Sequence, residues 1–134
     1  MPHLTVEYSA NLEEQINVMD LLRKIHEAAL ATGVFEVGAV RTRAARREHY
    51  VIADGHTDNS FVAITARIAP GRDAETRKRL GQAIFDAACN YLEKVYQKTP
   101  IGISLEVHEI DNSMAYRKNN LHMIVKNRAA KAPA

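Results

Sequence analysis

The chain of 134 residues has very little cysteine, no long apolar run and almost no excess charge. Cys89 is its single cysteine, which excludes an intramolecular disulfide and favours a reducing, intracellular setting. No apolar segment in the first thirty residues is long enough for a secretion signal or a membrane span. We therefore expect a cytoplasmic protein that makes no contact with a membrane.

The charge balance argues against a nucleic-acid partner. Eighteen basic residues face sixteen acidic ones, and the formal net charge is +2. Binding by phosphate neutralisation needs a concentrated positive surface, which this balance does not supply. The chain also lacks a phosphate-binding glycine loop, and its six histidines form neither an HExxH motif nor a pair spaced by four residues. We expect no nucleic acid, no metal and no cofactor.

One pattern of secondary structure occurs twice along the chain. In each copy a strand-like alternation precedes a helical apolar period, and a second strand-like stretch follows. The copies span residues 2–44, with strands at 3–8 and 37–43, and residues 60–110, with strands at 61–68 and 103–110. Two strand–helix–strand units with right-handed crossovers predict an α+β (α/β) fold, in which a four-stranded mixed sheet carries both helices on one face.

Capping residues indicate where the two helices begin and end. Asn17 can cap the first helix and Gly33 can end it, although Asn11 offers an earlier start. Asp73 can cap the second helix, and Pro100 prevents its continuation. We expect the second helix to be continuous between these two residues.

The remaining segments complete a single domain of residues 1–126. A turn signal at 54–55 between the units predicts a short hairpin, and residues 127–134 lack an apolar period and are predicted to be disordered. The third predicted strand has apolar residues on both sides, as Phe61 and Val62 show. A bare apolar face favours self-association, unless irregular segments of the chain cover it.

Pro2 stands immediately before the first predicted strand. A proline is tolerated at the first position of a strand, so its role can be purely structural. If Met1 is removed, however, Pro2 becomes the chain terminus and carries a free secondary amine that can accept a proton. With Met1 in place, the nitrogen of Pro2 lies in a peptide bond and is not basic.

Four segments together resemble the 5-carboxymethyl-2-hydroxymuconate Δ-isomerases, a family of the tautomerase superfamily: PHLTVEYS, AVRTR, YVIADGHTDNSFVAITARIAPGRDAETR and YRKNNLHMIVK. The likeness runs from Pro2 to about Lys126. It implies an isomerase of homoprotocatechuate (4-hydroxyphenylacetate) degradation, a homotrimer whose subunits each hold two fused units, and a short strand near the C-terminus. It also implies that the amino-terminal proline is the general base.

The resemblance adds Arg41 and Arg72 to Pro2 as catalytic residues, both of them also binding substrate. Arg41 falls near the end of the strand predicted at 37–43, on the same face as Arg43, an additional substrate contact. Arg72 precedes the helix cap at Asp73, where free main-chain amides favour an anion. Two arginines suit a small polycarboxylate, since a guanidinium can hold a carboxylate with two parallel hydrogen bonds.

The predicted reaction is an allylic ketonisation that needs no redox step and no cofactor. Pro2 takes the proton from the 2-hydroxyl group and returns a proton to carbon 5, once burial and nearby guanidinium groups have lowered the pKa of its amine. Two alternatives stay open: a tautomerase of another oxo acid such as phenylpyruvate, or a non-enzymatic oligomeric module that binds a small anion.

Overall fold

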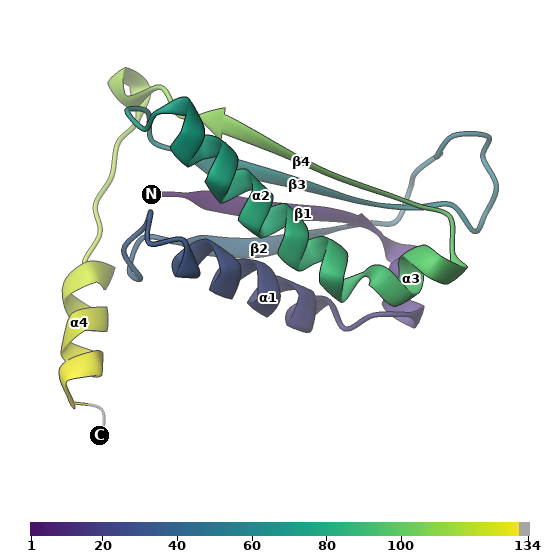
Figure 1. Ribbon diagram of the computed structural model, residues 1–134, viewed down its shortest axis with the longest axis horizontal. Helices are drawn as coiled ribbons and strands as arrows, with labels where there is room; N and C mark the ends of the chain where they lie inside the picture. Colours follow the sequence, from purple (N-terminus) through teal and green to yellow (C-terminus); the bar gives the residue numbers. More distant parts are fainter. Residues whose placement is uncertain (132–134) are drawn as a thin grey trace.

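The computed structural model describes residues 1–131 and consists of one four-stranded sheet with two long helices on one face (Figure 1). The elements are β1 (His3–Ser9), the 3-10 helix η1 (Ala10–Glu14), α1 (Val18–Ala31), β2 (Arg41–Arg47), β3 (Ser60–Ile68), α2 (Ala74–Tyr91), α3 (Glu93–Lys98), β4 (Ile101–Glu109), the 3-10 helix η2 (Asn112–Met114) and α4 (Leu121–Lys131). The predicted α+β fold of two strand–helix–strand units is confirmed.

The sheet has the strand order β2-β1-β3-β4. Within each unit the two strands run parallel, whereas β1 and β3 join the units as an antiparallel pair. His3 pairs with Arg41 on one side and with Arg67 on the other, and Ile68 pairs with Glu109. The starts of β1 and β2 and the ends of β3 and β4 therefore lie at the same end of the sheet, which we call its N-terminal end.

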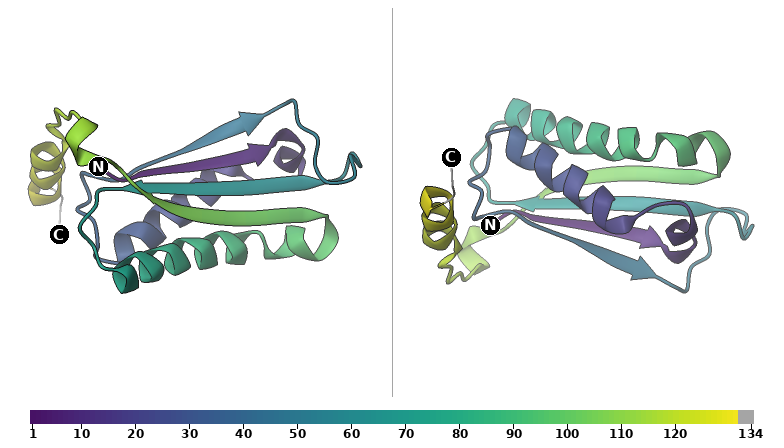
Figure 2. Two further views of the ribbon diagram at one scale, coloured as in Figure 1. Left: turned by 90° about the horizontal axis from the view of Figure 1, so that it is seen from above. Right: turned by 90° about the horizontal axis from the view of Figure 1, so that it is seen from below.

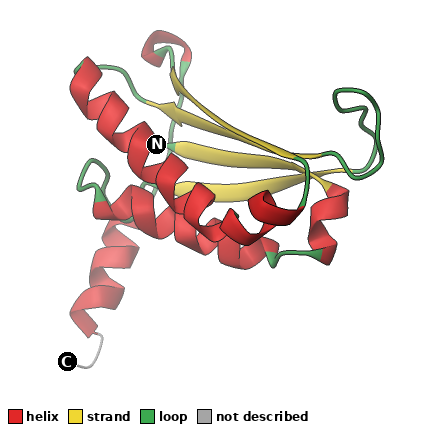
Figure 3. Ribbon diagram, turned by 45° about the vertical axis from the view of Figure 1, so that its right-hand side comes forward, coloured by secondary structure: helices red, strands yellow, loops and turns green. Residues whose placement is uncertain are grey.

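The core lies between the sheet and the two long helices (Figure 2, Figure 3). Alternation along β1 and β3 turns every second side chain toward the helices. The fully buried side chains of this layer include Leu4, Val6, Val62 and Ile68 from the strands and Leu21, Ile25, Leu80 and Ile84 from the helices. Burial of this continuous apolar layer is what fixes the strand register, because a slip of one residue would expose it.

The other face of the sheet is more polar than the sequence pattern suggested. Phe61 does lie on this face, where its ring meets Tyr50 edge-on with centroids 6.4 Å apart. Its neighbours across the strands are largely polar, and Arg47 Nε forms an ion pair of 2.7 Å with Glu7 Oε2. The apolar character of this face is therefore a weak argument for self-association.

The second strand was predicted at the wrong place. Residues 37–39 form a turn, in which Ala39 N donates to Glu36 O at 3.0 Å, and the strand β2 begins only at Arg41. Arg41 thus starts the strand instead of lying near its end. The parallel pairing with β1 decides these bounds, since the main-chain N–H of Arg41 donates to Pro2 O at 3.1 Å.

Side-chain caps begin both long helices, as predicted. Asn17 Oδ1 accepts from the main-chain N–H of Asp20 at 3.1 Å, and Asp73 Oδ1 accepts from that of Thr76 at 2.7 Å. The earlier start at Asn11 is wrong for α1. Asn11 lies within η1, and its side chain donates to the main-chain carbonyl of Asn59, just before β3, at 2.8 Å.

The second helix is not continuous to Pro100, because it breaks at Leu92 between α2 and α3. Leu92 is fully buried, so the chain turns there to bring an apolar side chain into the core. The preceding residue, Tyr91, is held by the other unit: its hydroxyl donates to Asn17 O at 2.9 Å and accepts from Asn17 N at 3.1 Å. Contacts between the units thus override the local helical period.

The segment between the units contains the predicted turn but not the predicted hairpin. Gly55 has a φ of +83°, the left-handed conformation that favours glycine, and Asp54 Oδ1 accepts from the main-chain N–H of His56 at 3.2 Å. Residues 48–59 form no strand pair. A hairpin is excluded by topology, because β1 lies between β2 and β3 in the sheet.

The C-terminal segment is helical where a short strand was predicted. Helix α4 covers Leu121–Lys131 and includes residues 127–131 of the tail predicted to be disordered; residues 132–134 of that tail lie outside the described part. The helix contacts the turn before β2, where an added Cβ at Gly38 would lie 2.8 Å from His122 Cα. His122 Nδ1 also lies 2.9 Å from Glu36 Oε2. Within residues 1–131, no helix combines the length and apolar character of a bilayer span.

Candidate active site

The N-terminal end of the sheet brings together Pro2 and three arginines from different segments. Pro2 precedes β1, and Arg41 is the first residue of β2. Arg72 lies in the connection from β3 to α2, and Arg117 lies in the segment after β4, which runs past the chain terminus toward α4 (Figure 1). The strand register described above puts all four segments at the N-terminal end of the sheet.

Pro2 is buried and Met1 is half-buried. The pKa of the Met1 amine is lowered from its ordinary value, first by burial and then by the positive charges of Arg117, Arg41 and Arg72, in that order of strength. A base at this terminus would therefore keep its unprotonated form to lower pH than an ordinary chain terminus.

Arg41 and Arg72 are both held by main-chain carbonyl groups. Arg41 Nη1 donates to the carbonyl of Ala39 in the turn before β2. Arg72 Nη1 donates to Ala69 O at 3.1 Å, and its guanidinium carbon lies 5.1 Å above the ring centroid of Phe35. Neutral carbonyls and an aromatic face orient a guanidinium without cancelling its charge.

No carboxylate neutralises these guanidinium groups within the described residues. The arginines that form ion pairs in residues 1–131 are Arg23, Arg46, Arg47 and Arg77. Arg41, Arg72 and Arg117 form none there. A cluster of cations without acidic partners is a site for an anion, and its location next to a buried chain terminus places that anion beside a potential base.

The side chain of Arg43 makes a different contact from that of Arg41. It shares the open sheet face, as predicted, but its Nη1 lies 3.1 Å from His3 Nδ1. The pKa of His3 is lowered by burial and next by Arg43, with smaller effects from Arg67 and Arg41. The structure therefore shows Arg43 against a histidine, while Arg41 and Arg72 are fixed by carbonyl groups.

Arg117 was missed by the sequence analysis. It lies in a segment without strand or helix period, so no pattern indicated what it faces. Its position depends on tertiary contacts. Ile110 N donates to Ile68 O at 2.7 Å, which continues the β3–β4 pairing and places the following segment at the N-terminal end. Arg117 Nη2 then donates to Asn112 Oδ1 at 3.0 Å.

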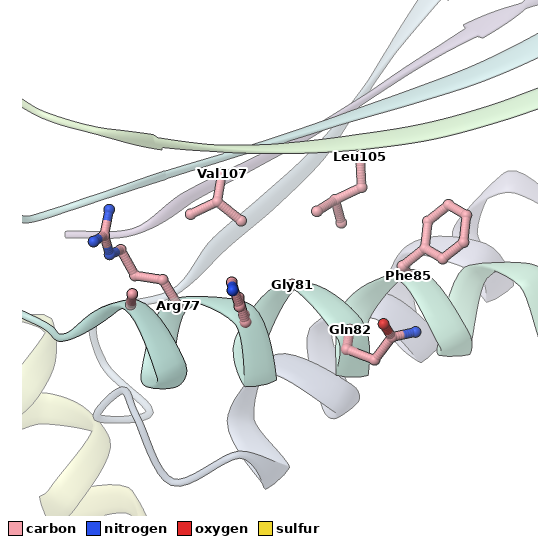
Figure 4. Close-up of a pocket in the computed structure, with 8 residues that line it drawn as sticks. Arg77, Gly81, Gln82, Phe85, Leu105 and Val107 are labelled. Carbon is pink, nitrogen blue, oxygen red and sulfur yellow. The ribbon is translucent and has the colours of Figure 1, made fainter.

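Two hollows of similar size differ in their chemistry. One, of 570 Å³, lies at the N-terminal end and is bordered by Met1, His3, Arg67 and Arg117. The other, of 580 Å³, is a groove between α2 and β4, in which Leu105 and Val107 point toward Gly81 (Figure 4). The groove is mainly apolar, whereas the first hollow is cationic and reaches the chain terminus.

The groove offers little chemistry of its own. Arg77 borders it, but Arg77 Nη1 is paired with Glu109 Oε1 at 3.1 Å. Within residues 1–131, no group of three or more histidine, cysteine or acidic side chains could hold a metal ion. The hollow at the N-terminal end is therefore the candidate active site. Pro2, Arg41 and Arg72 lie at the same end of the sheet but are not among the residues that line the hollow.

Comparison with solved structures defines the class of the protein. A fused 4-OT in the form of a symmetric trimer superposes with a TM-score of 0.59 at 18% identity, over 92% of this chain and 98% of that one. This likeness shows the fold alone, that of the tautomerases. The protein is an α+β protein of the tautomerase fold.

Closer similarities define the family. A model of the 5-carboxymethyl-2-hydroxymuconate isomerase family matches residues 2–125, and the chain belongs to this family of isomerases. A 5-carboxymethyl-2-hydroxymuconate Delta-isomerase of Escherichia coli is 29% identical over 126 residues, which are 94% of this chain and 100% of the relative. The crystal structure of a 5-carboxymethyl-2-hydroxymuconate isomerase from Deinococcus radiodurans R1 superposes with a TM-score of 0.87 at 32% identity, over 92% of this chain and 93% of that one.

Proposed function

We propose that the protein ketonises 5-carboxymethyl-2-hydroxymuconate in the degradation of homoprotocatechuate, with the amine of Pro2 as general base. One observation carries the proposal: Pro2 is buried next to a chain terminus whose amine is influenced by the charges of Arg117, Arg41 and Arg72, and these have no acidic partner in the described residues. The names of the relatives from E. coli and D. radiodurans supply the substrate.

Removal of Met1 is a condition of this mechanism, because only a terminal Pro2 has a basic nitrogen. The reaction begins when that nitrogen accepts the proton of the 2-hydroxyl group, which leaves a dienolate. The same nitrogen then returns a proton to carbon 5, where a new C–H bond forms while the C2–O bond becomes a carbonyl. No electrons are gained or lost overall, so the step needs no co-reactant.

The arginines act on the negative charges of the substrate. The main chain of Arg41 is hydrogen-bonded to that of Pro2, and its guanidinium stabilises the charge that accumulates on the dienolate oxygen. Arg72, fixed over Phe35, holds a carboxylate through its free N–H groups. Arg43 makes an additional contact with the substrate from the strand that begins at Arg41.

We also propose that the protein acts as a homotrimer in the cytoplasm. The fused 4-OT of the same fold is described as a symmetric trimer, which supports this number of subunits. Sedimentation velocity of the purified protein tests it, and a monomer at micromolar concentration would contradict it.

The experiment that tests the base uses one protein in two states. The chain is produced with a removable peptide ahead of Pro2, and ketonisation is followed by ultraviolet absorbance before and after cleavage to a free Pro2. We expect cleavage to raise kcat about 10²- to 10⁴-fold, the usual contribution of general acid–base catalysis. The intact mass confirms the terminus in each sample.

Two other outcomes change the proposal in different ways. Equal rates before and after cleavage would contradict Pro2 as the base. A rate no better than buffer in both samples would contradict the substrate, and phenylpyruvate would then be assayed as the substrate of the alternative tautomerase.

A further inference from the structure

The segment between β4 and α4 forms one wall of the candidate active site and is fixed at both of its ends. At its start, Ile110 extends the pairing of β3 and β4. At its end, α4 rests on the turn before β2, where the absence of a Cβ at Gly38 permits the close approach of His122. Arg117 lies between these anchors, so its position follows from the fold.

Arg117 presents an uncompensated positive charge to the hollow. Its contact with Asn112 is to a neutral amide oxygen, which orients the guanidinium and leaves N–H donors unused. Asp111, the acidic residue that borders the same hollow, is already bonded to Ser113 N at 3.0 Å and to Ser113 Oγ at 2.6 Å. Lys118 and Arg67 add further positive charge to the lining.

The charge of Arg117 also acts strongly on the chain terminus. Among the charged groups that lower the pKa of the Met1 amine, Arg117 ranks before Arg41 and Arg72. The charge of Arg117 therefore acts at the same end of the sheet as those of Arg41 and Arg72.

The number of cations agrees with the number of anionic groups in the proposed substrate. A muconate has a carboxylate at each end, and the carboxymethyl substituent adds a third. The dienolate oxygen is a fourth anionic position. Arg41 takes that oxygen, and Arg72 and Arg43 take one carboxylate each, which leaves one carboxylate without a partner. A guanidinium is the side chain best suited to it, because its planar donors match the two oxygens.

We infer that Arg117 binds the third carboxylate and makes the site specific for tricarboxylates over dicarboxylates. This inference rests on the proposed function, since it assigns the arginine to a group of that substrate. It gives the segment after β4 a direct role in substrate recognition, although this segment lies outside both strand–helix–strand units.

The test compares two substrates in the protein with a free Pro2. 5-Carboxymethyl-2-hydroxymuconate carries the third carboxylate, and 2-hydroxymuconate lacks it. For Arg117→Ala we expect the KM of the tricarboxylate to rise about tenfold or more, as the loss of a charged hydrogen-bonded contact predicts, with kcat nearly unchanged. Both substrates are assayed well above the pKa of the terminal amine, because loss of the Arg117 charge also lets that pKa rise. Under this condition the KM of the dicarboxylate should not change.

Two further variants separate recognition from structure. Arg117→Lys keeps the charge without the planar donors, and we expect it to restore part of the lost KM for the tricarboxylate. Arg128→Ala removes an exposed arginine in the last turn of α4 and should leave both substrates unaffected. An equal loss on both substrates, or no loss on the tricarboxylate, would overturn the role of Arg117.

Failure of the proposed function would look different. If the unsubstituted protein turns over neither substrate, calorimetric binding of propane-1,2,3-tricarboxylate and of glutarate still tests the third anion position. Tighter binding of the tricarboxylate that disappears in Arg117→Ala would retain that position without the isomerase. Equal binding of the two acids would overturn it.

Discussion

The two ends of the sheet have the same main-chain construction and very different side chains. At the N-terminal end the first residue of β2 donates its N–H to Pro2 O, and at the opposite end the first residue of β3, Ser60, donates to Pro100 O at 3.0 Å. In both cases the acceptor is the proline that precedes the parallel partner strand. The doubled unit thus has two comparable ends at which a site could form.

At the opposite end, which we call the distal end, polar side chains form hydrogen bonds with other groups of the protein. Ser60 Oγ donates to Pro100 O at 2.8 Å, and Thr99 Oγ1 donates to Gln15 Oε1 at 2.8 Å. The hollow there, of 470 Å³, is bordered by the carboxylates of Glu14 and Asp58. The N-terminal end instead presents Arg41, Arg72 and Arg117, which form no ion pair within residues 1–131. The two ends of the sheet have the same main-chain construction, but only the side chains at the N-terminal end favour an anion.

The largest effect that distinguishes the two ends should come from Arg41. We expect Arg41→Ala to lower kcat about 10²- to 10³-fold, because it removes a donor that faces charge developing in the transition state. Lys98→Ala at the distal end is the matched control and should leave kcat unchanged. Stopped-flow absorbance with 5-carboxymethyl-2-hydroxymuconate measures both. Similar losses in the two variants would remove the distinction between the ends.

Arg72 should affect binding more than chemistry. Its guanidinium is fixed by Ala69 and Phe35 on one side, so its remaining donors are available to a carboxylate. We expect Arg72→Ala to raise KM about tenfold with a smaller change in kcat. Arg79→Ala removes an arginine of α2 that donates to a main-chain carbonyl elsewhere and should not change KM. An unchanged KM in Arg72→Ala would exclude it from substrate binding.

The pH dependence tests the same cluster of charges. Burial and the three guanidinium groups lower the pKa of an amine at this terminus. The base form therefore persists to lower pH, and kcat/KM should fall only when the pH drops below that lowered pKa. Removing one positive charge by Arg72→Ala lets the pKa rise, so the acidic limb of the profile should move to higher pH.

The control for this shift is ionic strength, since salt screens charges at a half-buried site only in part. High salt should shrink the difference between the two profiles without removing it. An acidic limb at the same pH in both proteins would show that Arg72 does not act on the base.

The sequence predicted those features of the fold that depend on local pattern. The alternation in β1 and β3 and the caps at Asn17 and Asp73 depend on neighbours a few residues away, and these predictions are confirmed. The bounds of β2 and the break at Leu92 depend on partners from elsewhere in the chain. Neither has a local signal, because pairing with β1 and burial in the core determine them.

The site was predictable only in part for the same reason. Pro2, Arg41 and Arg72 were predicted through a family resemblance and through their places near element ends, and their roles stay predictions. Arg117 is placed at the N-terminal end by the register of β4 and by the contact of α4 with Gly38. The contact at Gly38 joins residues that are far apart in sequence, and the region of α4 was predicted to hold a short strand and a disordered tail. No periodicity of the segment around Arg117 could have indicated this.

The smallest expected effects compare the caps of the two helices, which lie at opposite ends of the sheet. Asn17 caps α1 near the distal end, and Asp73 caps α2 beside Arg72. We expect Asn17→Ala to lower the free energy of unfolding by about 1 kcal/mol, with kcat/KM unchanged. Urea unfolding followed by circular dichroism measures the first quantity and the absorbance assay the second.

Asp73→Ala should lower both stability and activity, because the cap also fixes the connection that carries Arg72. The hydrogen bond from the main chain of Thr76 lowers the pKa of the Asp73 carboxyl below its ordinary value. Its contribution to stability is therefore present above the unfolded-state pKa and is lost as the pH falls through the lower, folded-state pKa. The stability difference between the protein and Asp73→Ala should accordingly shrink in acid, whereas that of Asn17→Ala should not depend on pH. Loss of activity in both cap variants would mean that the distal end takes part in the site after all.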